Sequence, residues 1–307
     1  MAACSSSSQS TDVQVNKQPL IDLFRGWPNP ALLPTDLLLH ETVAALSDPG
    51  TRIQALLYGP DAGAPHVRKN IARWLTAYYK PREAISPERI ANTGGASQGL
   101  GCIMQVYTDP VYTQNIWCVV PCYMLAFRIL ADAGFAHKLR SVPEDDEGID
   151  IDFLREALQQ SERRSIANGE TEIMPMFKAP RPYGKFYRHL IYAVPTFSNP
   201  SSKVMSLRRR EQLVSLAREF DALVVCDDVY DFLQWPTSSM ATTSTSTALI
   251  PRVVDVDRFL DGGAERLGAD GFGNVASSGS FSKIAAPGLR SGWVEGTPKF
   301  AFGASQA

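Results

Sequence analysis

The chain has 307 residues, enough to bury a substantial core and to form one large domain or two smaller ones. Apolar residues make up 44% of the sequence and charged residues 20%, values that are typical of a globular protein. With 30 basic and 32 acidic residues the formal net charge is -2, so the composition gives no general attraction to nucleic acid or to an anionic membrane.

The N-terminal stretch, residues 1–18, is polar and rich in serine. It lacks the basic start and the apolar core of a secretory signal, and no apolar run in the chain approaches the roughly 20 residues that span a bilayer. The five cysteines are odd in number, which favours free thiols in a reducing compartment. We therefore expect a disordered tail over residues 1–18 and a cytoplasmic protein.

Helical and strand-like patterns alternate along the rest of the chain. In order, they predict a helix over 64–79, a Gly-rich turn leading into a helix over 94–109, a strand over 115–120, helices over 123–134 and 149–164, a strand over 189–195, a helix over 206–220, a strand over 222–230, and extended segments over 274–282 and 289–296. This alternation predicts an α/β protein with a doubly wound, mostly parallel sheet. Residues 236–273 include the low-complexity run TSSMATTSTST and predict a mobile surface loop.

The sequence GSFSKIAAPGLRSGW holds a lysine, Lys283, after Ser280 and Ser282 and before Arg290. A lysine at a strand end is usually a solvated surface charge, but here the hydroxyls can bond to an anion and the guanidinium can grip a phosphate. A lysine beside a phosphate site suggests either a P-loop or a Schiff base to pyridoxal phosphate. Because Ile284 follows the lysine, the P-loop spacing is absent and the Schiff-base interpretation stands.

A pyridoxal phosphate site requires a carboxylate for the pyridine nitrogen, and Asp227 ends a buried strand. Tyr230 and Asn199 follow strand ends and can reach the phenolic oxygen of the ring. The alternatives are a turn at Asn199 and Pro200, and a helix N-cap at Asp227 and Asp228.

The phosphate and the ring face need further partners. The sequence TGGASQG offers the backbone N–H groups of Ala96 and Ser97 at a helix N-terminus, where anions bind readily. Tyr123 could stack on the ring, although a tyrosine of the core is the plain alternative. All these residues follow predicted strands or turns at the edge where parallel sheets carry their sites.

Taken together, these motifs resemble the class I/II aminotransferases of pyridoxal-phosphate fold type I, in the branch with 2-aminoadipate, kynurenine and aromatic aminotransferases. The resemblance rests on four segments in the family's order, which cover most of residues 20–296: YGPDAGAPHVRKNIARWL, NTGGASQGL, VPTFSNPSSKVMSLRRREQLVSLAREFDALVVCDDVYDFLQW and GSFSKIAAPGLRSGW.

The resemblance implies an enzyme that transfers an amino group between an amino acid and a 2-oxo acid, with pyridoxal 5'-phosphate as cofactor. Lys283, Asp227 and Tyr230 would be its catalytic residues, and Lys283 would move the substrate proton. The residues implied to bind the cofactor are Ala96, Ser97, Tyr123, Asn199, Asp227, Tyr230, Ser280, Ser282, Lys283 and Arg290.

It also implies a homodimer in which Tyr58 reaches the phosphate of the neighbouring subunit. Gly26 would lie on the substrate side, and Arg25 is our candidate for a ligand of the substrate carboxylate. We expect residues 19–60 to form an N-terminal arm with this substrate-side segment, and residues 61–307 to form the cofactor-binding large domain. Because family members continue past the position of Ala307, we expect a C-terminally truncated member that largely lacks the small domain and its carboxylate-binding arginine.

Several other interpretations remain open from the sequence. One is a truncated or degenerate paralogue that binds the cofactor or a partner subunit without turnover, and another is a fold-type-I lyase, decarboxylase or synthase. The sequence GASQG, with Ser97, also fits the nucleophile elbow of a hydrolase, but only His137 and His189 follow it. Cys118 and Cys122 could form half a metal site that nothing completes, so we expect no metal, and GLG lacks the third glycine of a dinucleotide fingerprint.

Overall fold

The computed structural model describes residues 26–167, 169, 176–234 and 247–307. The chain divides into two units, residues 1–33 and 34–307, and each is described by itself. In the first unit the described residues form a short helix, η1 (Pro30–Leu32), whose N-terminus is capped by Asn29. The tail expected over 1–18 lies outside the described residues, and the domain boundary expected at residue 60 stays a prediction.

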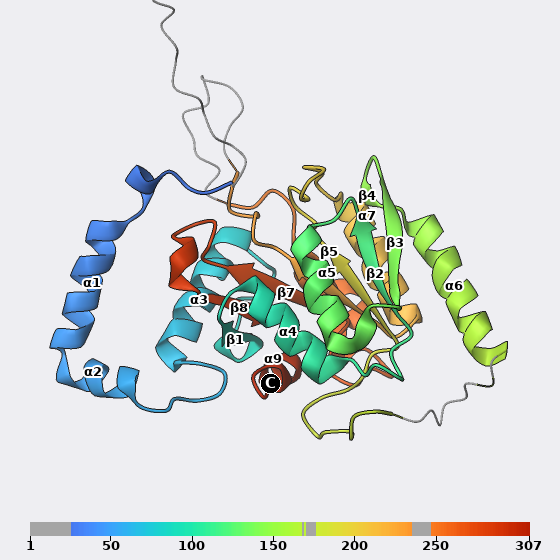
Figure 1. The fold of residues 1–307 in the computed structure, drawn as a ribbon, viewed down its shortest axis with the longest axis horizontal. Helices are drawn as coiled ribbons and strands as arrows, with labels where there is room; N and C mark the ends of the chain where they lie inside the picture. The colour runs from blue at the N-terminus through green and yellow to red at the C-terminus, as the bar shows by residue number, and fades with distance from the viewer. Residues whose placement is uncertain (1–25, 168, 170–175, 235–246) are drawn as a thin grey trace, which may run out of the picture. The chain divides into compact units, whose positions relative to one another are not determined.

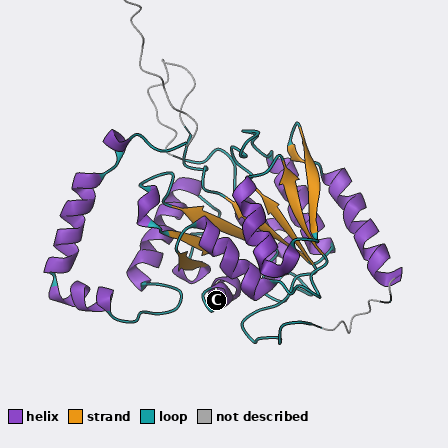
Figure 2. Ribbon diagram, in the orientation of Figure 1, coloured by secondary structure: helices purple, strands orange, loops and turns teal. Residues whose placement is uncertain are grey.

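Helices and strands alternate through most of the second unit (Figure 2). Its strands are β1 (Ile90–Thr93), β2 (Asn115–Val120), β3 (Leu139–Asp145), β4 (Gly148–Ile149), β5 (His189–Ala193), β6 (Ala222–Asp227), β7 (Val275–Ser280) and β8 (Gly292–Glu295). Its α-helices are α1 (Thr35–Ser47), α2 (Pro49–Leu56), α3 (Pro65–Tyr79), α4 (Ala96–Tyr107), α5 (Met124–Leu130), α6 (Ile151–Ala167), α7 (Leu207–Glu219), α8 (Val253–Phe259) and α9 (Pro298–Ala304). Shorter helical turns are η2 (Pro87–Arg89), η3 (Ala131–Phe135), η4 (Leu260–Glu265) and η5 (Pro287–Leu289).

The strands form one sheet in the order β1-β8-β7-β6-β5-β2-β3-β4. The pairs β2 with β3, β2 with β5, β5 with β6, and β6 with β7 are parallel, whereas β8 pairs antiparallel with both β7 and β1. Helices connect the parallel strands, because parallel neighbours need a long crossover connection. The predicted α/β fold with a mostly parallel, doubly wound sheet is confirmed.

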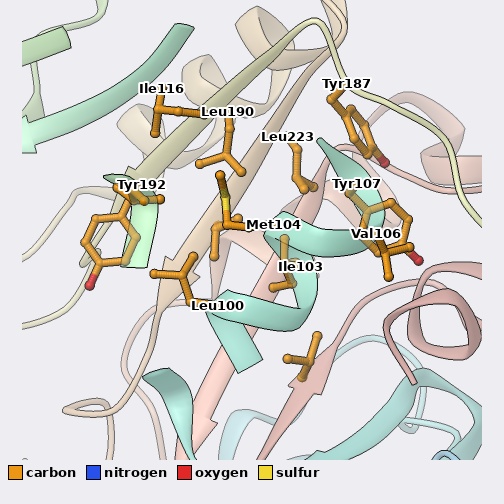
Figure 3. Packing of buried hydrophobic residues seen from close by; sticks show 14 of the residues in the cluster. Leu100, Ile103, Met104, Val106, Tyr107, Ile116, Tyr187, Leu190, Tyr192 and Leu223 are labelled. Carbon is orange, nitrogen blue, oxygen red and sulfur yellow. The ribbon is translucent and has the colours of Figure 1, made fainter. Parts of the chain in front are cut away.

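Helices cover both faces of the sheet, and alternate strand residues pack against each layer. On one face α4 places Leu100, Ile103 and Met104 against Leu190 and Leu223 of the central strands (Figure 3). Helices α4 and α5 lie on the near side of the sheet in Figure 1. On the other face α6, α7 and α8 pack against the opposite side chains of the same strands. The central strands are therefore buried on both faces, which explains their continuous apolar sequences.

Two segments differ from the sequence predictions. Part of the surface loop expected over 236–273 lies outside the described residues, but residues 253–259 form helix α8, so the prediction of a surface loop is wrong for that part. Val253 and Val256 are buried there, and so are the acids Asp255 and Asp257. Because acids usually lie on the surface, their presence led the sequence pattern to suggest an exposed segment. In place of one helix over 123–134, the α-helix α5 ends at Leu130 and the π-helical turn η3 follows it directly.

Among the described residues, no helix is both long and apolar enough to cross a membrane.

A buried ion-pair group ties α8 to the sheet. The guanidinium of Arg252, only 1% exposed, donates two hydrogen bonds to Asp255 at 3.0 and 3.1 Å and one to Glu295 of β8 at 2.7 Å. The same guanidinium lies 4.1 Å from the centre of the Tyr79 ring. Each charge in this group is paired within a region that water does not reach, so loss of one partner leaves the others uncompensated.

We expect Arg252→Met to lower the free energy of unfolding by about 3–5 kcal/mol, because two buried carboxylates lose their partner. Chemical denaturation followed by circular dichroism measures this change. The control is Arg155→Met, which removes a surface pair with Glu219 and is expected to cost about 0–1 kcal/mol. Equal small losses for the two variants would contradict the role given to the buried group.

Candidate functional site

The predicted site residues gather at the carboxyl edge of the parallel strands. Asp227 is the last residue of β6, and Ser280 is the last residue of β7. Asn199 follows β5 and Tyr123 follows β2, each in the loop after its strand. Parallel pairing places all four strand ends at one edge, and the register sets Asp227 opposite Ser278.

The carboxylate of Asp227 has one oxygen paired and one left free. Its Oδ2 accepts a hydrogen bond of 2.8 Å from the hydroxyl of Tyr192 on β5. Its Oδ1 is buried and has no hydrogen-bond partner among the described residues. Burial raises the pKa of this carboxyl from 3.8 to about 6, against the lowering effects of the Tyr192 hydroxyl, the Val229 backbone N–H and the Lys283 amine. The free oxygen is therefore an acceptor that lacks a donor.

Tyr230, Asn199 and Lys283 form a second group beside Asp227. The side-chain amide of Asn199 donates a hydrogen bond of 3.1 Å to the Tyr230 hydroxyl, which leaves the proton of that hydroxyl free to be donated elsewhere. Burial, with a contribution from the charge of Asp227, raises the pKa of Tyr230. The amine of Lys283 is exposed and lies 5.8 Å from the centre of the Tyr230 ring.

Two serines and an arginine converge after β7. The Ser280 hydroxyl donates to Ser282 Oγ at 2.9 Å, and Arg290 Nη1 donates to the same Oγ at 3.2 Å. Gly95 permits this approach, since its φ is +104° and a Cβ built on it would lie 3.0 Å from Arg290 Nη2. Hydroxyl and guanidinium donors that point to one small region are suited to an anion with several oxygens.

The N-terminus of α4 lies next to this group. Gly95 occupies the N-cap position and gives no side-chain cap, so the first N–H groups of the helix, those of Ala96 and Ser97, lack a capping side chain. The Ser278 hydroxyl of β7 contacts the carbonyl oxygen of Ala96 at 3.5 Å, which joins the helix start to the strand. The helix dipole adds positive potential where the serines and Arg290 already gather.

Tyr123 borders the same region at the start of α5. Burial, together with the charge of Asp227, raises the pKa of Tyr123, which is half-buried. A cavity of about 20 Å³, room for one water molecule, is lined by residues that include Ala96, Ser97, Tyr123, Tyr192, Asp227 and Ser278.

Three predicted residues are not joined to this group. Tyr58 is fully exposed, and the structure gives its side chain no hydrogen bond within the described residues. Gly26 belongs to the first unit, which is described by itself, and has a φ of +58°. Arg25 lies outside the described residues.

Sequence patterns missed two members of the site, Tyr192 and Ser278. Tyr192 is the only hydroxyl-bearing residue in β5, and Ser278 lies two residues before Ser280, on the same face of β7. A search for polar side chains on the face shared with Asp227 would have found both residues.

The hydrolase and metal-site interpretations find no support in the geometry of the described residues. Ser97 is the second residue of α4, whereas His189 begins β5, at the opposite edge of the sheet, and its Nε2 lies 2.8 Å from Glu162. Such an arrangement does not form a hydrolase triad. Among the described residues, no group of three or more His, Cys, Asp or Glu side chains could hold a metal ion.

Comparisons with known proteins agree with this geometry. The family model of aminotransferase class I and II matches residues 31–304. An uncharacterized protein of Saccharomyces cerevisiae is 35% identical over 90% of this chain and 63% of its own length. Aromatic-amino-acid aminotransferase 1 of Thermococcus litoralis is 28% identical over 93% of this chain and 56% of its own length.

Among solved structures, an alpha-aminoadipate aminotransferase of Thermus thermophilus, complexed with N-(5'-phosphopyridoxyl)-L-leucine, superposes with a TM-score of 0.65 at 25% identity. The superposition covers 92% of this chain and 57% of that one. The chain thus spans less than two thirds of the length of these proteins.

The pKa of Asp227 predicts how stability changes with pH in the cofactor-free protein. Because the folded pKa of about 6 lies above the ordinary 3.8, the folded state binds more protons than the unfolded state between these values. The stabilisation is fully present below about pH 4 and is lost as the pH rises through about 6. The shift of about two units corresponds to about 3 kcal/mol.

We therefore expect Asp227→Asn to match the wild type in unfolding free energy below about pH 4 and to exceed it by up to about 3 kcal/mol above pH 7. Urea denaturation at a series of pH values measures the difference. Glu156→Gln, which changes an exposed carboxylate on α6, is the control for adding an amide. A pH-independent difference between Asp227→Asn and wild type would show that the carboxyl is not desolvated as described.

Proposed function

Because the chain belongs to the aminotransferase class I and II family, we propose that it binds pyridoxal 5'-phosphate and transfers an amino group between an amino acid and a 2-oxo acid. The observation that carries this proposal is the buried, unpartnered Oδ1 of Asp227 beside a cluster of anion-binding groups. A cofactor with a basic ring nitrogen at one end and a phosphate at the other would supply a donor for the Oδ1 of Asp227 and an anion for the cluster. The phosphopyridoxyl compound bound to the Thermus thermophilus aminotransferase supports the same choice.

The residues present fit this cofactor at each of its polar groups. Ser280, Ser282 and Arg290 supply donors for the phosphate, together with the N–H groups of Ala96 and Ser97. The Oδ1 of Asp227 would accept a hydrogen bond from the protonated ring nitrogen. Tyr230, whose hydroxyl already accepts from Asn199, would donate its own proton to the phenolic oxygen. Tyr123 would cover one face of the ring.

When bound, pyridoxal phosphate supplies an electron sink that stabilises negative charge at the substrate Cα. Asp227 maintains this property by holding the ring nitrogen protonated, and Tyr192 fixes the orientation of the carboxylate. Lys283 would hold the cofactor, and its amine would serve as the base for the proton of the substrate Cα. The position of Lys283 near Tyr230 keeps the amine at the edge of the sheet where the other groups lie.

We extend the proposal to a homodimer in which Tyr58 contacts the phosphate in the neighbouring subunit. In its favour, the Tyr58 ring is fully exposed, and a hydroxyl without a partner among the described residues is free to serve another subunit. Arg25 and Gly26 are proposed for the substrate side, and a cytoplasmic location belongs to the proposal as well.

The test follows the absorbance of the bound cofactor when single amino acids are added to the loaded protein. We expect conversion to the aminated cofactor by the wild type and by Lys69→Ala, which removes an exposed lysine of α3. Lys283→Ala is expected to slow the conversion by about 10³-fold or more, because the substrate Cα proton loses its proposed base. Borohydride reduction and peptide mapping should locate the cofactor on Lys283 in the wild type.

A reduced cofactor mapped to another lysine would overturn the central assignment. Cofactor binding without any conversion would favour the interpretation as a protein that holds the cofactor without turnover. Release of carbon dioxide or cleavage of the amino acid side chain would favour a decarboxylase or a lyase.

A further inference from the structure

A second cavity lies at the opposite edge of the sheet from Asp227 and Lys283. Its volume is about 670 Å³, within the range of small-molecule sites. Val275, the first residue of β7, lines this cavity, whereas Ser280 at the other end of the same strand belongs to the proposed cofactor site. The segment before β1, helix α8 and the start of α9 complete the walls. The basic residues that line it are Arg82, Arg89, Arg258 and Lys299.

Arg89 is the unusual member of this set. Its side chain is only 9% exposed, and its Nε is buried and has no hydrogen-bond partner among the described residues. The nearest carboxylate oxygen, Glu295 Oε1, is 3.8 Å from Nε, too far for a hydrogen bond. The other oxygen of Glu295 is already taken by Arg252 at 2.7 Å. Arg89 is therefore held in the wall of a cavity by an ion pair with Glu295, but its Nε makes no hydrogen bond, and a buried donor without an acceptor is costly.

The two acids that line the cavity are neutralised by other groups. Asp257 accepts from Arg218 at 2.9 Å through one oxygen and from the backbone N–H of Asn274 at 2.8 Å through the other. Glu83 forms an ion pair of 3.2 Å with Arg258, which satisfies one of the lining cations. The carboxylates of the lining therefore leave its remaining positive charges uncompensated.

The lining cations without an ion pair among the described residues are Arg82 and Lys299, because Arg89 pairs with Glu295 at 3.8 Å. Arg82 is exposed and forms no ion pair with a described residue. Lys299 donates to the carbonyl oxygen of Asp270 at 2.9 Å, and its amine lies 4.2 Å from the centre of the Phe272 ring, but it forms no ion pair with a described residue. Two such cations around one cavity match a ligand with two negative charges.

We propose that this cavity binds a small molecule with a doubly charged oxyanion group, either a phosphate or a pair of carboxylates. Planar guanidinium groups bind both kinds of oxygen in a bidentate manner, and the ligand would accept from the Arg89 Nε that makes no hydrogen bond. The site is separate from the phosphate-binding residues of the cofactor site, because the two lie at opposite ends of β7. The chain would then carry a binding site for a metabolite in addition to its cofactor.

The experiment is isothermal titration of the cofactor-loaded protein with inorganic phosphate, and separately with succinate, at constant ionic strength set by chloride. We expect one saturable site for at least one of these anions. The double variant Arg82→Ala with Lys299→Ala should lower its affinity about tenfold or more, because charge-assisted contacts are lost. Arg89→Gln should also lower the affinity for the anion about tenfold or more. Lys69→Ala with Arg73→Ala, which removes two exposed charges from α3, should change affinity by less than about twofold.

Arg290→Ala separates the two anion sites. Binding that is lost in Arg290→Ala but kept in the double variant belongs to the cofactor site and would overturn the proposal. Absence of saturable binding by both anions would overturn it too, as would affinity unchanged in the double variant. The double variant alters only exposed side chains, so the test holds even if Arg89→Gln does not fold.

Discussion

Parallel pairing of β2, β5, β6 and β7 is the constraint on which the rest of the molecule depends. It brings the carboxyl ends of four strands to one edge, where the chain leaves each strand and exposes polar side chains. The same pairing fixes the register, so Tyr192, Asp227 and Ser278 lie on the face that carries α4. The start of α4 then points its free N–H groups at the edge where the strands end.

The neighbouring acids Asp227 and Asp228 show how strongly strand alternation separates functions. Asp227 faces the α4 side, with one oxygen on Tyr192 and one free. Asp228 faces the other side, where Ser277 donates to it, and burial together with the charge of Asp231 raises its pKa well above the ordinary value. Two adjacent carboxyls are thus desolvated, but only the first is directed toward the groups that can hold a cofactor. The second belongs to the interior that supports the strand ends.

The sequence predicted the parts of this structure that rest on local pattern. Continuous apolar runs identified β2, β5 and β6, and a lysine between two serines and an arginine identified the turn after β7 where Ser280, Ser282 and Arg290 converge. Features that depend on tertiary contacts were missed. Helix α8 carries buried acids whose partners are distant in sequence, and β1 has only four residues, held by pairing with β8. Likewise, Tyr192 and Arg89 become distinctive only when their neighbours are known. The Tyr192 hydroxyl donates to Asp227 on another strand, and the buried Arg89 Nε finds no hydrogen-bond acceptor among the described residues.

The proposed function depends on the free oxygen of Asp227, which would serve a protonated ring nitrogen. The most direct measurement is the ¹⁵N resonance of pyridoxal phosphate that is ¹⁵N-labelled in its ring and bound to the protein at neutral pH. We expect the chemical shift of a protonated ring nitrogen in the wild type and in Asp228→Asn, and that of a neutral nitrogen in Asp227→Asn. A neutral nitrogen in the wild type, or a resonance that Asp227→Asn leaves unchanged, would contradict it.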